Sequence, residues 1–354
     1  MKTAGYDVAV IGASTLLGKE LLEVIEERKF PVAKLVTVSG EAGEPSLPIV
    51  DLSRRRRAAA DYQEEVPTRF DFAFIAAEHP GLPSWIERAS RERNGSEGAR
   101  VVIDLCSSVS QGATADLRAP LIEGPSAPAH DSAAAKTLHV IAAPHAATLV
   151  ASVLLLRLAA RLRLRSAVAQ IFSPASEIGP RAIDELQKQT INLLSFQKVP
   201  REAFGAQIAF NLLPRLGAGF EKMDGLESRV RNELDSCLGG RAPSPAIRLI
   251  RVPVFYSTAV SLYAETEERV PPSDLVAALD GAPVVIRRAS EKAPSQADAA
   301  GSDEILVDAI QPDAAHPAGL WLWAVADNMR IAAVNAVLIA EGLHRQRQPL
   351  HLLK

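Results

Sequence analysis

Residues 7–18 read DVAVIGASTLLG, an apolar run that leads directly into a glycine and then into small residues. The β-branched residues of this run predict a buried β-strand over residues 7–12. From Leu17 to Val24 the apolar residues recur at helical spacing, and a charged segment follows. A strand, a glycine turn and a helix in this order form the unit from which doubly wound α/β domains are built.

Strand and helix patterns continue to alternate along the first part of the chain. Further apolar strands are expected at residues 34–38, 70–76 and 100–104, with helical segments between them. Strands that are apolar throughout, rather than at every second residue, indicate a parallel sheet that helices cover on both faces. We therefore expect an α/β fold with a Rossmann-type doubly wound parallel sheet.

The second half of the chain carries a different pattern. The apolar run 141–156 reads as a buried helix, and a helix from about residue 147 to 163 is expected to open this half. Residues 285–315 mix Ala, Ser, Asp and Pro, which predicts an exposed, irregular excursion from the sheet, that is, a long surface loop. Asp327 is positioned to cap a final helix. Strands of a mostly antiparallel sheet are expected at residues 167–172, 247–255, 259–265 and 321–326.

Charge and composition exclude several classes of partner. The 354 residues contain 39 Lys+Arg and 42 Asp+Glu, a net charge of -3, so neither nucleic acid nor an anionic membrane is expected as the main partner. No apolar run reaches the roughly 18 residues that span a bilayer, and the first residues do not resemble an export signal. Cys106 and Cys237 are the two cysteines. They suit a reducing cytoplasm, and neither a disulfide scaffold nor a metal site is expected.

The glycine turn after the first strand is a candidate nucleotide loop. Glycines here let the backbone turn tightly and approach a pyrophosphate held at a helix N-terminus. Thr15 stands where the usual pattern has its middle glycine. Two interpretations therefore stay open, a strand-to-helix turn without a ligand and a dinucleotide site. The residues of that site would be Gly12, Ser14, Thr15, Leu16 and Gly18.

The second predicted strand ends in Ser39-Gly40-Glu41. A carboxylate at this point would accept hydrogen bonds from a ribose 2′-OH and repel a 2′-phosphate. Ser39 and Glu41 are thus candidate cofactor residues, and they favour NAD over NADP. The alternative is that Glu41 is a solvated loop residue.

Several segments, taken together and in order, resemble the aspartate-semialdehyde dehydrogenase family. Each segment alone is weak evidence for the family, but the segments occur in the family's order and spacing between residues 7 and 343. The segments are GASTLLG at 12–18, FPV at 30–32, VVIDLCSS at 101–108, FGAQIAFN at 204–211, RVPVF at 251–255 and DNMR at 327–330.

The resemblance implies a fold, an assembly and a chemistry. The expected domains are a dinucleotide-binding domain over residues 1–142, completed by a C-terminal helix at 327–354, and a catalytic-type, dimerisation domain over residues 143–326. A homodimer is expected. In this family a Cys thiolate at a helix N-terminus attacks the aldehyde, a His handles protons, and a Gln orients the acyl group.

The family's catalytic positions hold other residues in this chain. Pro144 and Thr148 keep the register of the cysteine loop and place Ala146 at the nucleophile. The same comparison places Ser173 at the Gln and Thr258 at the His. A methyl group cannot form a thiohemiacetal, so we expect the ordinary dehydrogenase reaction to be lost, since losing a nucleophile removes on the order of a million-fold in rate.

The binding positions are partly retained. Arg251 matches the family's substrate-carboxylate Arg, although an Arg on a strand can also pair with a carboxylate for structure alone. The family's phosphate-binding Arg corresponds to Ser110, and Lys222 is the counterpart of its phosphate-binding Lys, with an insertion in the local register. The pattern resembles Usg-type paralogues, which keep the fold with an altered active site.

The sequence is also consistent with other functions. The chain could bind NAD or a small carboxylate without turnover, or act as a purely structural dimer. It could instead be an active NAD(P)-dependent semialdehyde oxidoreductase that uses relocated residues such as Cys106. For Cys106 the favoured interpretation is a small buried apolar residue. His145 could carry protons, but a loop imidazole that caps the backbone is favoured, because a helix N-terminus disfavours imidazolium.

Overall fold

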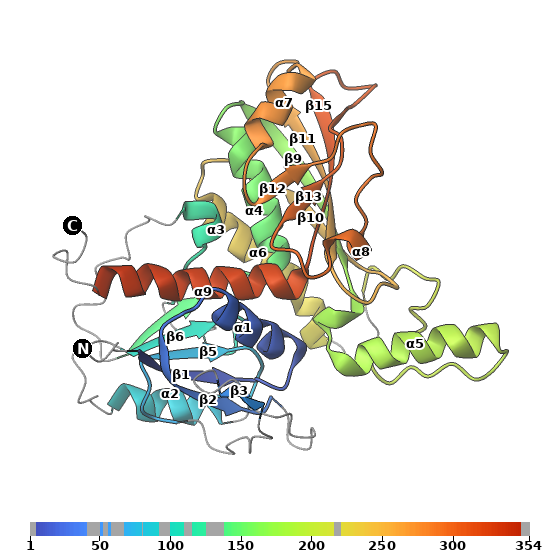
Figure 1. Ribbon diagram of the computed structural model, residues 1–354. Coiled ribbons are helices and arrows are strands. Elements are labelled where there is room, and N and C mark those ends of the chain that lie inside the picture. The colour runs from blue at the N-terminus through green and yellow to red at the C-terminus, as the bar shows by residue number, and fades with distance from the viewer. Residues whose placement is uncertain are drawn as a thin grey trace. The chain divides into compact units, whose positions relative to one another are not determined.

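The computed structural model describes residues 5–40, 50–51, 56–57, 67–79, 81–91, 100–109, 115–124, 138–215 and 221–347. The chain divides into two compact units (Figure 1). The first unit consists of residues 1–144 and 332–354, and the second of residues 145–331.

The first unit is built on a parallel six-stranded sheet with the strand order β2-β1-β5-β6-β8-β7. Every pair along this order is parallel, which confirms the doubly wound sheet predicted from the apolar strands. The strands are β1 (Tyr6–Ile11), β2 (Val32–Val38), β5 (Phe72–Ile75), β6 (Arg100–Asp104), β7 (Asp116–Leu117) and β8 (Leu138–Ala142), and β3 (Val50–Asp51) pairs separately with β4 (Arg56–Arg57).

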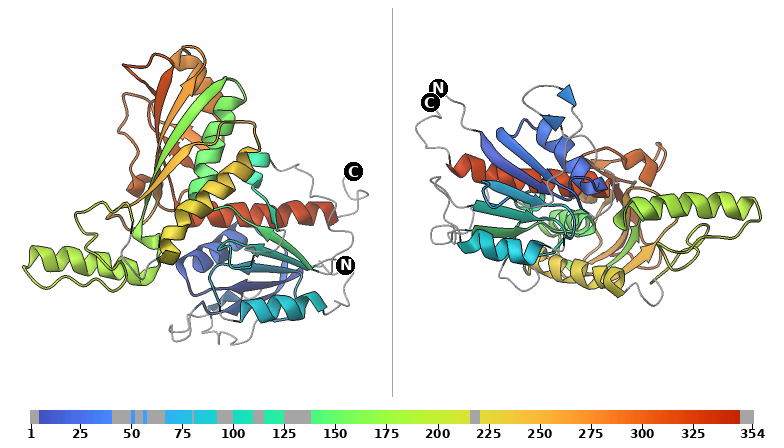
Figure 2. Two further views of the ribbon diagram at one scale, coloured as in Figure 1. Left: turned by 180° about the vertical axis from the view of Figure 1, so that it is seen from behind. Right: turned by 90° about the horizontal axis from the view of Figure 1, so that it is seen from below.

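Alternate residues of each strand point to opposite faces, and both faces are buried. Val8 and Val10 of β1 belong to an apolar cluster with α1 (Leu16–Glu27) and α9 (Asn328–Arg347). Ala9 and Ile11 belong to a second cluster with α2 (Leu82–Arg91). Helices therefore cover the sheet on both sides, α1 and α9 on one and α2 on the other (Figures 1 and 2). The short helix α3 (Pro120–Glu123) follows β7.

The apolar run 141–156 is not one helix. Its beginning belongs to β8, which pairs in parallel with β6, and the helix α4 (Ala146–Ala159) starts only after Pro144 and His145. A short apolar strand and a buried helix share the same composition, so apolarity alone does not separate them. The prediction of a helix that opens the second half is confirmed.

The second unit contains a mixed seven-stranded sheet with the order β10-β9-β11-β15-β13-β12, and β14 pairs with β15. The pairs β10–β9 and β12–β13 are parallel and the others are antiparallel, so the predicted, mostly antiparallel sheet is confirmed. The strands are β9 (Leu164–Ser173), β10 (Ala246–Arg251), β11 (Thr258–Thr266), β12 (Val284–Ile286), β13 (Ile305–Val307), β14 (Gln311–Pro312) and β15 (Gly319–Ala326).

Two predicted boundaries in this unit were wrong. The strand expected at 247–255 ends at Arg251, close to Pro253, whose missing N–H cannot continue a ladder. The exposed excursion expected at 285–315 contains β13, whose residues Ile305, Leu306 and Val307 are buried. Three apolar residues inside a polar segment are too few to produce a recognisable strand pattern.

Helices lie mainly on one face of the mixed sheet. Helix α4 is buried on almost all sides and packs against β9, β11, α6 (Glu221–Leu238) and α7 (Pro272–Leu279). The opposite face carries half-exposed side chains, among them Val168 and Trp321. The remaining helices of this unit are the 3₁₀ helix η2 (Ala175–Glu177), α5 (Pro180–Leu194) and α8 (Gln296–Ala299).

Helix α5 and the segment after it form an arm, defined here as residues 180–213, that projects from the mixed sheet (Figures 1 and 2). Gln189 is fully buried in the arm and bonds the backbone of Pro200, Ala206, Ile208 and Ala209. Glu185 accepts hydrogen bonds from the amides of Ala203 and Phe204. These buried side chains tie the segment to the helix that precedes it.

No helix in the described part of the chain is long and apolar enough to span a membrane.

Candidate functional site

Ala146 is the first residue of α4 and is buried. The preceding residue, His145, caps the helix, because its Nδ1 accepts a hydrogen bond from the Ala147 amide at 3.2 Å. Its other ring nitrogen, Nε2, lies 2.7 Å from Oε2 of Glu177. An imidazole that accepts at Nδ1 carries its proton at Nε2, so His145 donates to the carboxylate. The predicted backbone cap is confirmed, and Glu177 is a partner that the sequence did not predict.

Glu177 is a buried carboxylate at the end of η2. Burial, the largest single influence, raises its pKa, and the interaction with His145 lowers it. The charge of Arg251 and a hydrogen bond from Asn328 act in the same direction and bring the pKa of Glu177 to about 2. Glu177 is therefore ionised at neutral pH, although it is enclosed by protein.

Asn328 connects three segments at the start of α9. Its Nδ2 donates to Oε1 of Glu177 at 3.0 Å. Its Oδ1 accepts from the Ser257 amide at 3.0 Å and from the Ser176 hydroxyl at 3.2 Å. Asp327, immediately before it, accepts from the amides of Met329 and Arg330, which confirms the predicted cap of the final helix. Asn328 thus fixes both Glu177 and the turn that leads into β11.

The positions expected to hold the orienting Gln, the base and the substrate Arg lie at neighbouring strand ends. Ser173 ends β9 and lies directly beside Arg251, which ends β10. The Arg251 guanidinium donates to the Ser173 hydroxyl. Thr258 begins β11, which pairs with β9, and its hydroxyl donates to the carbonyl of Phe172 at 3.3 Å. Ser173, Arg251 and Thr258 are all buried, and the two hydroxyls already have protein partners.

Ser257 occupies a turn position of unusual geometry. Its φ is +69°, in the left-handed region that glycine adopts most easily. Its side chain is fully buried, and its hydroxyl has no hydrogen-bond partner within the described residues. Its amide and carbonyl are held by Asn328 and by Gln296. A buried hydroxyl of this kind marks a place where a water or a ligand atom would complete the hydrogen bonding.

A second buried carboxylate reaches the first turn of α4 from α6. Oε2 of Glu233 accepts from the His145 amide and from the Thr148 hydroxyl, both at 2.8 Å. Its other oxygen lies 2.7 Å from Nε of Arg229, one turn earlier on α6. Two carboxylates, Glu177 and Glu233, are therefore bonded to His145, and no local motif predicted either contact.

The glycine loop of the first unit closes tightly on itself. Thr15 caps α1: its hydroxyl donates to the Gly12 carbonyl at 2.7 Å and accepts from the Gly18 amide at 3.1 Å. Gly12 has φ +86°, and a Cβ on it would lie 2.6 Å from the Cβ of Ala77. A Cβ on Gly18 would lie 2.1 Å from the Gly12 carbonyl. Both glycines are thus required by packing, whether or not a ligand binds.

The same loop has features that fit a pyrophosphate. The first-turn amides of a helix lack partners inside the helix, and α1 begins at Leu16, directly after β1 and the glycine turn. Ser14 and Ser39 lie side by side, with their hydroxyls 3.1 Å apart, and the Gly40 amide donates to Ser14 at 3.0 Å. The loop is therefore compatible with a dinucleotide. Glu41 lies outside the described residues.

Two further phosphate-site predictions cannot be placed. Ser110 lies outside the described residues, and Lys222 lies in α6, where the structure does not describe its side chain.

Cys106 follows β6, and its amide donates to Oδ1 of Asp104 at 3.0 Å. Its partly buried side chain packs against the apolar cluster that includes α1 and α9. This is the contact of a small apolar residue.

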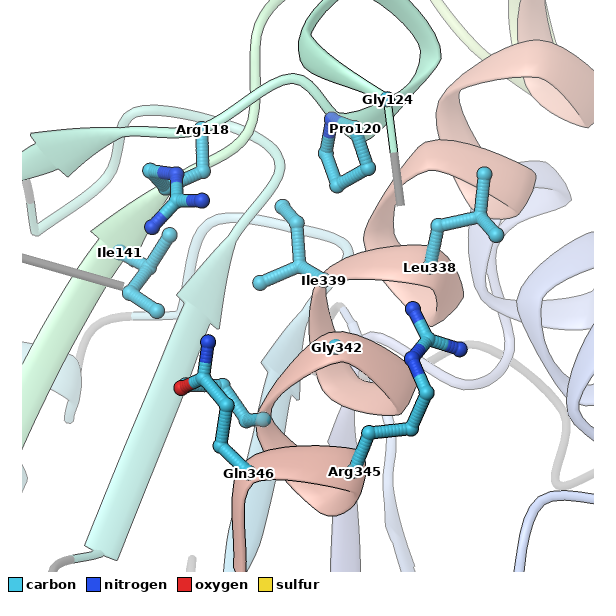
Figure 3. A pocket seen from close by; sticks show the side chains of 10 residues that line it. Arg118, Pro120, Gly124, Ile141, Leu338, Ile339, Gly342, Arg345 and Gln346 are labelled. Atoms are coloured by element: carbon cyan, nitrogen blue, oxygen red, sulfur yellow. The ribbon is translucent and has the colours of Figure 1, made fainter. Parts of the chain in front are cut away.

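The first unit contains a small cavity that involves none of the predicted site residues (Figure 3). Its volume is about 20 Å³, which is about the room that one water needs. Arg118, Arg345 and Gln346 supply its polar groups, and Pro120, Ile141, Leu338 and Ile339 are among its apolar lining. Among the described residues, no group of three or more His, Cys, Asp or Glu could hold a metal ion.

Comparison with known proteins decides the family. The model of the semialdehyde dehydrogenase dimerisation domain matches residues 155–331. An aspartate-semialdehyde dehydrogenase from Aquifex aeolicus is 30% identical over 350 residues, which cover 97% of this chain and 99% of that protein. The chain belongs to the aspartate-semialdehyde dehydrogenase family.

Other members of the aspartate-semialdehyde dehydrogenase family extend the comparison. A USG-1 protein homolog from Pseudomonas aeruginosa is 29% identical over 341 residues, which cover 95% of this chain and 97% of that protein. A solved structure of a probable aspartate-semialdehyde dehydrogenase from Pseudomonas aeruginosa has a TM-score of 0.82 at 27% identity, and covers 98% of this chain and all of that chain. The resemblance inferred from the sequence motifs is confirmed.

Within this family member, hydrogen bonds connect the region around Ala146 to the turn before Thr258. The connection passes from His145 through Glu177 and Asn328 to Ser257. Ser173 joins through Arg251, whose charge acts on Glu177. The site is therefore an enclosed polar network, and sulfur is absent from the position at the start of α4.

Proposed function

We propose that this protein is an aspartate-semialdehyde dehydrogenase relative that does not catalyse the ordinary oxidation of a semialdehyde to an acyl phosphate. The observation that carries the proposal is the methyl side chain of Ala146 at the N-terminus of α4. In the ordinary route a thiolate at this position adds to the aldehyde carbon, and hydride leaves for the nicotinamide to form a thioester. Phosphate then displaces the sulfur. Without a sulfur atom neither covalent intermediate forms.

The other two positions support the same conclusion. Thr258 lacks a group that titrates near neutral pH, so it cannot serve as the general base. Ser173 is too short to replace a Gln amide, and its hydroxyl already accepts from Arg251. Loss of the nucleophile, the base and the orienting amide together leaves binding as the function that the site can retain.

The proposed ligands are NAD and a small carboxylate. Gly12, Ser14, Thr15, Leu16 and Gly18, with Ser39 and Glu41, would hold the dinucleotide, which when bound supplies a hydride acceptor. Glu41 favours NAD over NADP, because a carboxylate there would accept hydrogen bonds from the ribose 2′-OH and would repel a 2′-phosphate. Arg251 would take the carboxylate, because a guanidinium presents paired donors to such a group. The unpartnered hydroxyl of Ser257 is a further donor for a ligand atom.

We further propose a cytoplasmic homodimer. The match to a dimerisation domain covers the mixed sheet and the arm. One face of the sheet carries half-exposed Val168 and Trp321, with Tyr263 against Trp321. The arm exposes Phe196 and Phe210, both at positive φ, which is uncommon for bulky residues. On the sheet face, Val168, Tyr263 and Trp321 are neighbours in the strand register, and adjacent exposed apolar side chains typically mark a protein interface.

The decisive test is a turnover assay with the purified protein, aspartate semialdehyde and phosphate. Reduced cofactor is followed by absorbance, with NAD and NADP in separate reactions. We expect no formation above the enzyme-free rate. An active aspartate-semialdehyde dehydrogenase, assayed in parallel, controls for substrate quality. Turnover that iodoacetamide abolishes would overturn the proposal and would point to Cys106 as a relocated nucleophile.

A further inference from the structure

The first turn of α4 is held by a carboxylate that belongs to the protein itself. One oxygen of Glu233 accepts both the His145 amide and the Thr148 hydroxyl. Glu233 is buried, and its second oxygen is paired with Arg229. It comes from α6, about 85 residues further along the chain, so no capping motif near α4 predicts it.

A helix N-terminus is the natural place for a negative group. Its amides point outward without partners in the helix, and its dipole favours an anion. The same field lowers the pKa of a cysteine thiol placed there and makes it a nucleophile. In this chain the carboxylate at that place is Glu233, which accepts a hydrogen bond from the amide of His145, the residue before Ala146.

Other charges surround the same turn. Glu177 is bonded to the imidazole of His145, and Arg251 acts on Glu177 by charge. Among the residues that the structure describes, the groups that bear on the start of α4 are therefore two carboxylates, one imidazole and two guanidinium groups, and Arg229 is the guanidinium bound to Glu233. The two carboxylates are the groups in direct hydrogen bonds with residue 145.

We propose that Glu233 is a positioning residue that acts as an internal counter-anion for α4, and that its charge makes position 146 unfavourable for a thiolate. The inference rests on the proposed function in one respect, the assignment of position 146 as the place of the lost nucleophile. The inference goes beyond the proposed function, because it implies that a cysteine restored at position 146 would not by itself ionise to a reactive thiolate. Like charges close together raise the pKa of an acid, so Glu233 opposes ionisation of a thiol beside it.

The test measures the pKa of a thiol introduced by A146C. The initial rate of iodoacetamide labelling is followed from pH 5 to pH 10, and peptide mass spectrometry separates this thiol from Cys106 and Cys237. In A146C we expect a pKa at or above about 8.5, the ordinary cysteine value. In A146C/E233Q we expect a pKa lower by about one unit or more, which gives about tenfold more thiolate at pH 7.

Two further variants keep the test decisive. D235N changes an exposed carboxylate on the same helix, so A146C/D235N should label like A146C. If E233Q prevents folding, R229M supplies the opposite change: it removes the guanidinium that faces Glu233, and A146C/R229M should show a higher thiol pKa than A146C. Circular dichroism melting establishes that each variant is folded.

A thiol pKa well below 8.5 in A146C itself would overturn the proposal, as would equal pKa values in A146C and A146C/E233Q. A merely structural role for Glu233 would change the melting temperature and leave the labelling profile unchanged. The outcome is independent of the turnover assay, which uses the unmodified protein and decides the proposed function separately.

Discussion

At the scale of single residues, the candidate site is a largely buried hydrogen-bond network. Asn328 makes three hydrogen bonds, to Glu177, Ser176 and the Ser257 amide. These groups are enclosed by protein, so water could not replace a hydrogen-bond partner that a substitution removes. Buried groups left in that condition cost about 1–3 kcal/mol each.

Replacing Asn328 by Ala should therefore lower the free energy of unfolding by about 2–4 kcal/mol, because more than one buried group loses its partner. Urea unfolding at neutral pH measures the change. N232A, at an exposed position of α6, is the matched control and should change stability by less than about 0.5 kcal/mol. Equal stabilities of N328A and the unmodified protein would show that the network contributes nothing to folding.

The Glu177 carboxylate also predicts a pH dependence. Its pKa in the folded protein is about 2, against an ordinary value of 4.5, so the unfolded chain binds the proton more readily. The stabilisation from Glu177 is thus complete above pH 4.5 and is lost as the pH falls toward 2. Unfolding free energies measured across this window should fall less steeply in E177Q than in the unmodified protein. Identical slopes in the two proteins would contradict the assignment.

At the scale of elements, α9 is anchored to the sheet of the first unit by a ring cluster. Nδ1 of His344 lies 2.9 Å from the Tyr6 hydroxyl, and the Arg347 guanidinium lies 4.9 Å from the ring centre of Phe72. Burial, with the charge of Arg345, lowers the pKa of His344. A neutral imidazole is therefore favoured in the folded protein.

Because the folded pKa of His344 is lowered, the unfolded chain binds its proton first as the pH falls below 6.5. His344 thus contributes a loss of stability on acidification from pH 7.5 to 5.5. H344F keeps a ring against Tyr6 but cannot titrate, so its melting temperature should fall less over this range than that of the unmodified protein. Differential scanning calorimetry at both pH values measures this, and a parallel fall in both proteins would refute it.

The arm depends on Gln189, whose amide bonds four backbone groups of residues 200–209. In Q189A these groups lose their partners, and the segment should detach locally from α5. Limited proteolysis should then cut between residues 196 and 212 at least tenfold faster. Q187A changes an exposed residue of the same helix and should be cut at the original rate. Unchanged cleavage of Q189A would mean that the apolar contacts of the arm are sufficient.

At the scale of the whole molecule, the proposed homodimer uses the half-exposed face of the mixed sheet. V168E/W321E places two carboxylates on this face, and burying an unpaired charge in an interface is strongly unfavourable. We expect sedimentation velocity to show a dimer for the unmodified protein and a monomer for the double variant. V276E introduces the same charge on α7, at a position of similar exposure, and should remain dimeric. A dimeric V168E/W321E would exclude this face as the interface.

Much of the architecture was determined by the sequence. Apolar strands such as 100–104 and the glycine turn at 12–18 encode a parallel sheet through local periodicity and backbone freedom, and these signals act over a few residues. The chemistry of residue 146 also follows from the sequence alone, because a methyl side chain is not nucleophilic in any environment.

Tertiary structure alone decided the environment of that methyl group. Glu177 and Glu233 reach His145 from positions 32 and 88 residues away, and Asn328 joins the network from the end of the second unit. Hydrogen bonds over such separations depend on how strands and helices pack, which no local pattern records. The sequence by itself therefore determined the fold class and the methyl side chain at position 146, whereas the packing of distant elements determined the charged groups around that position.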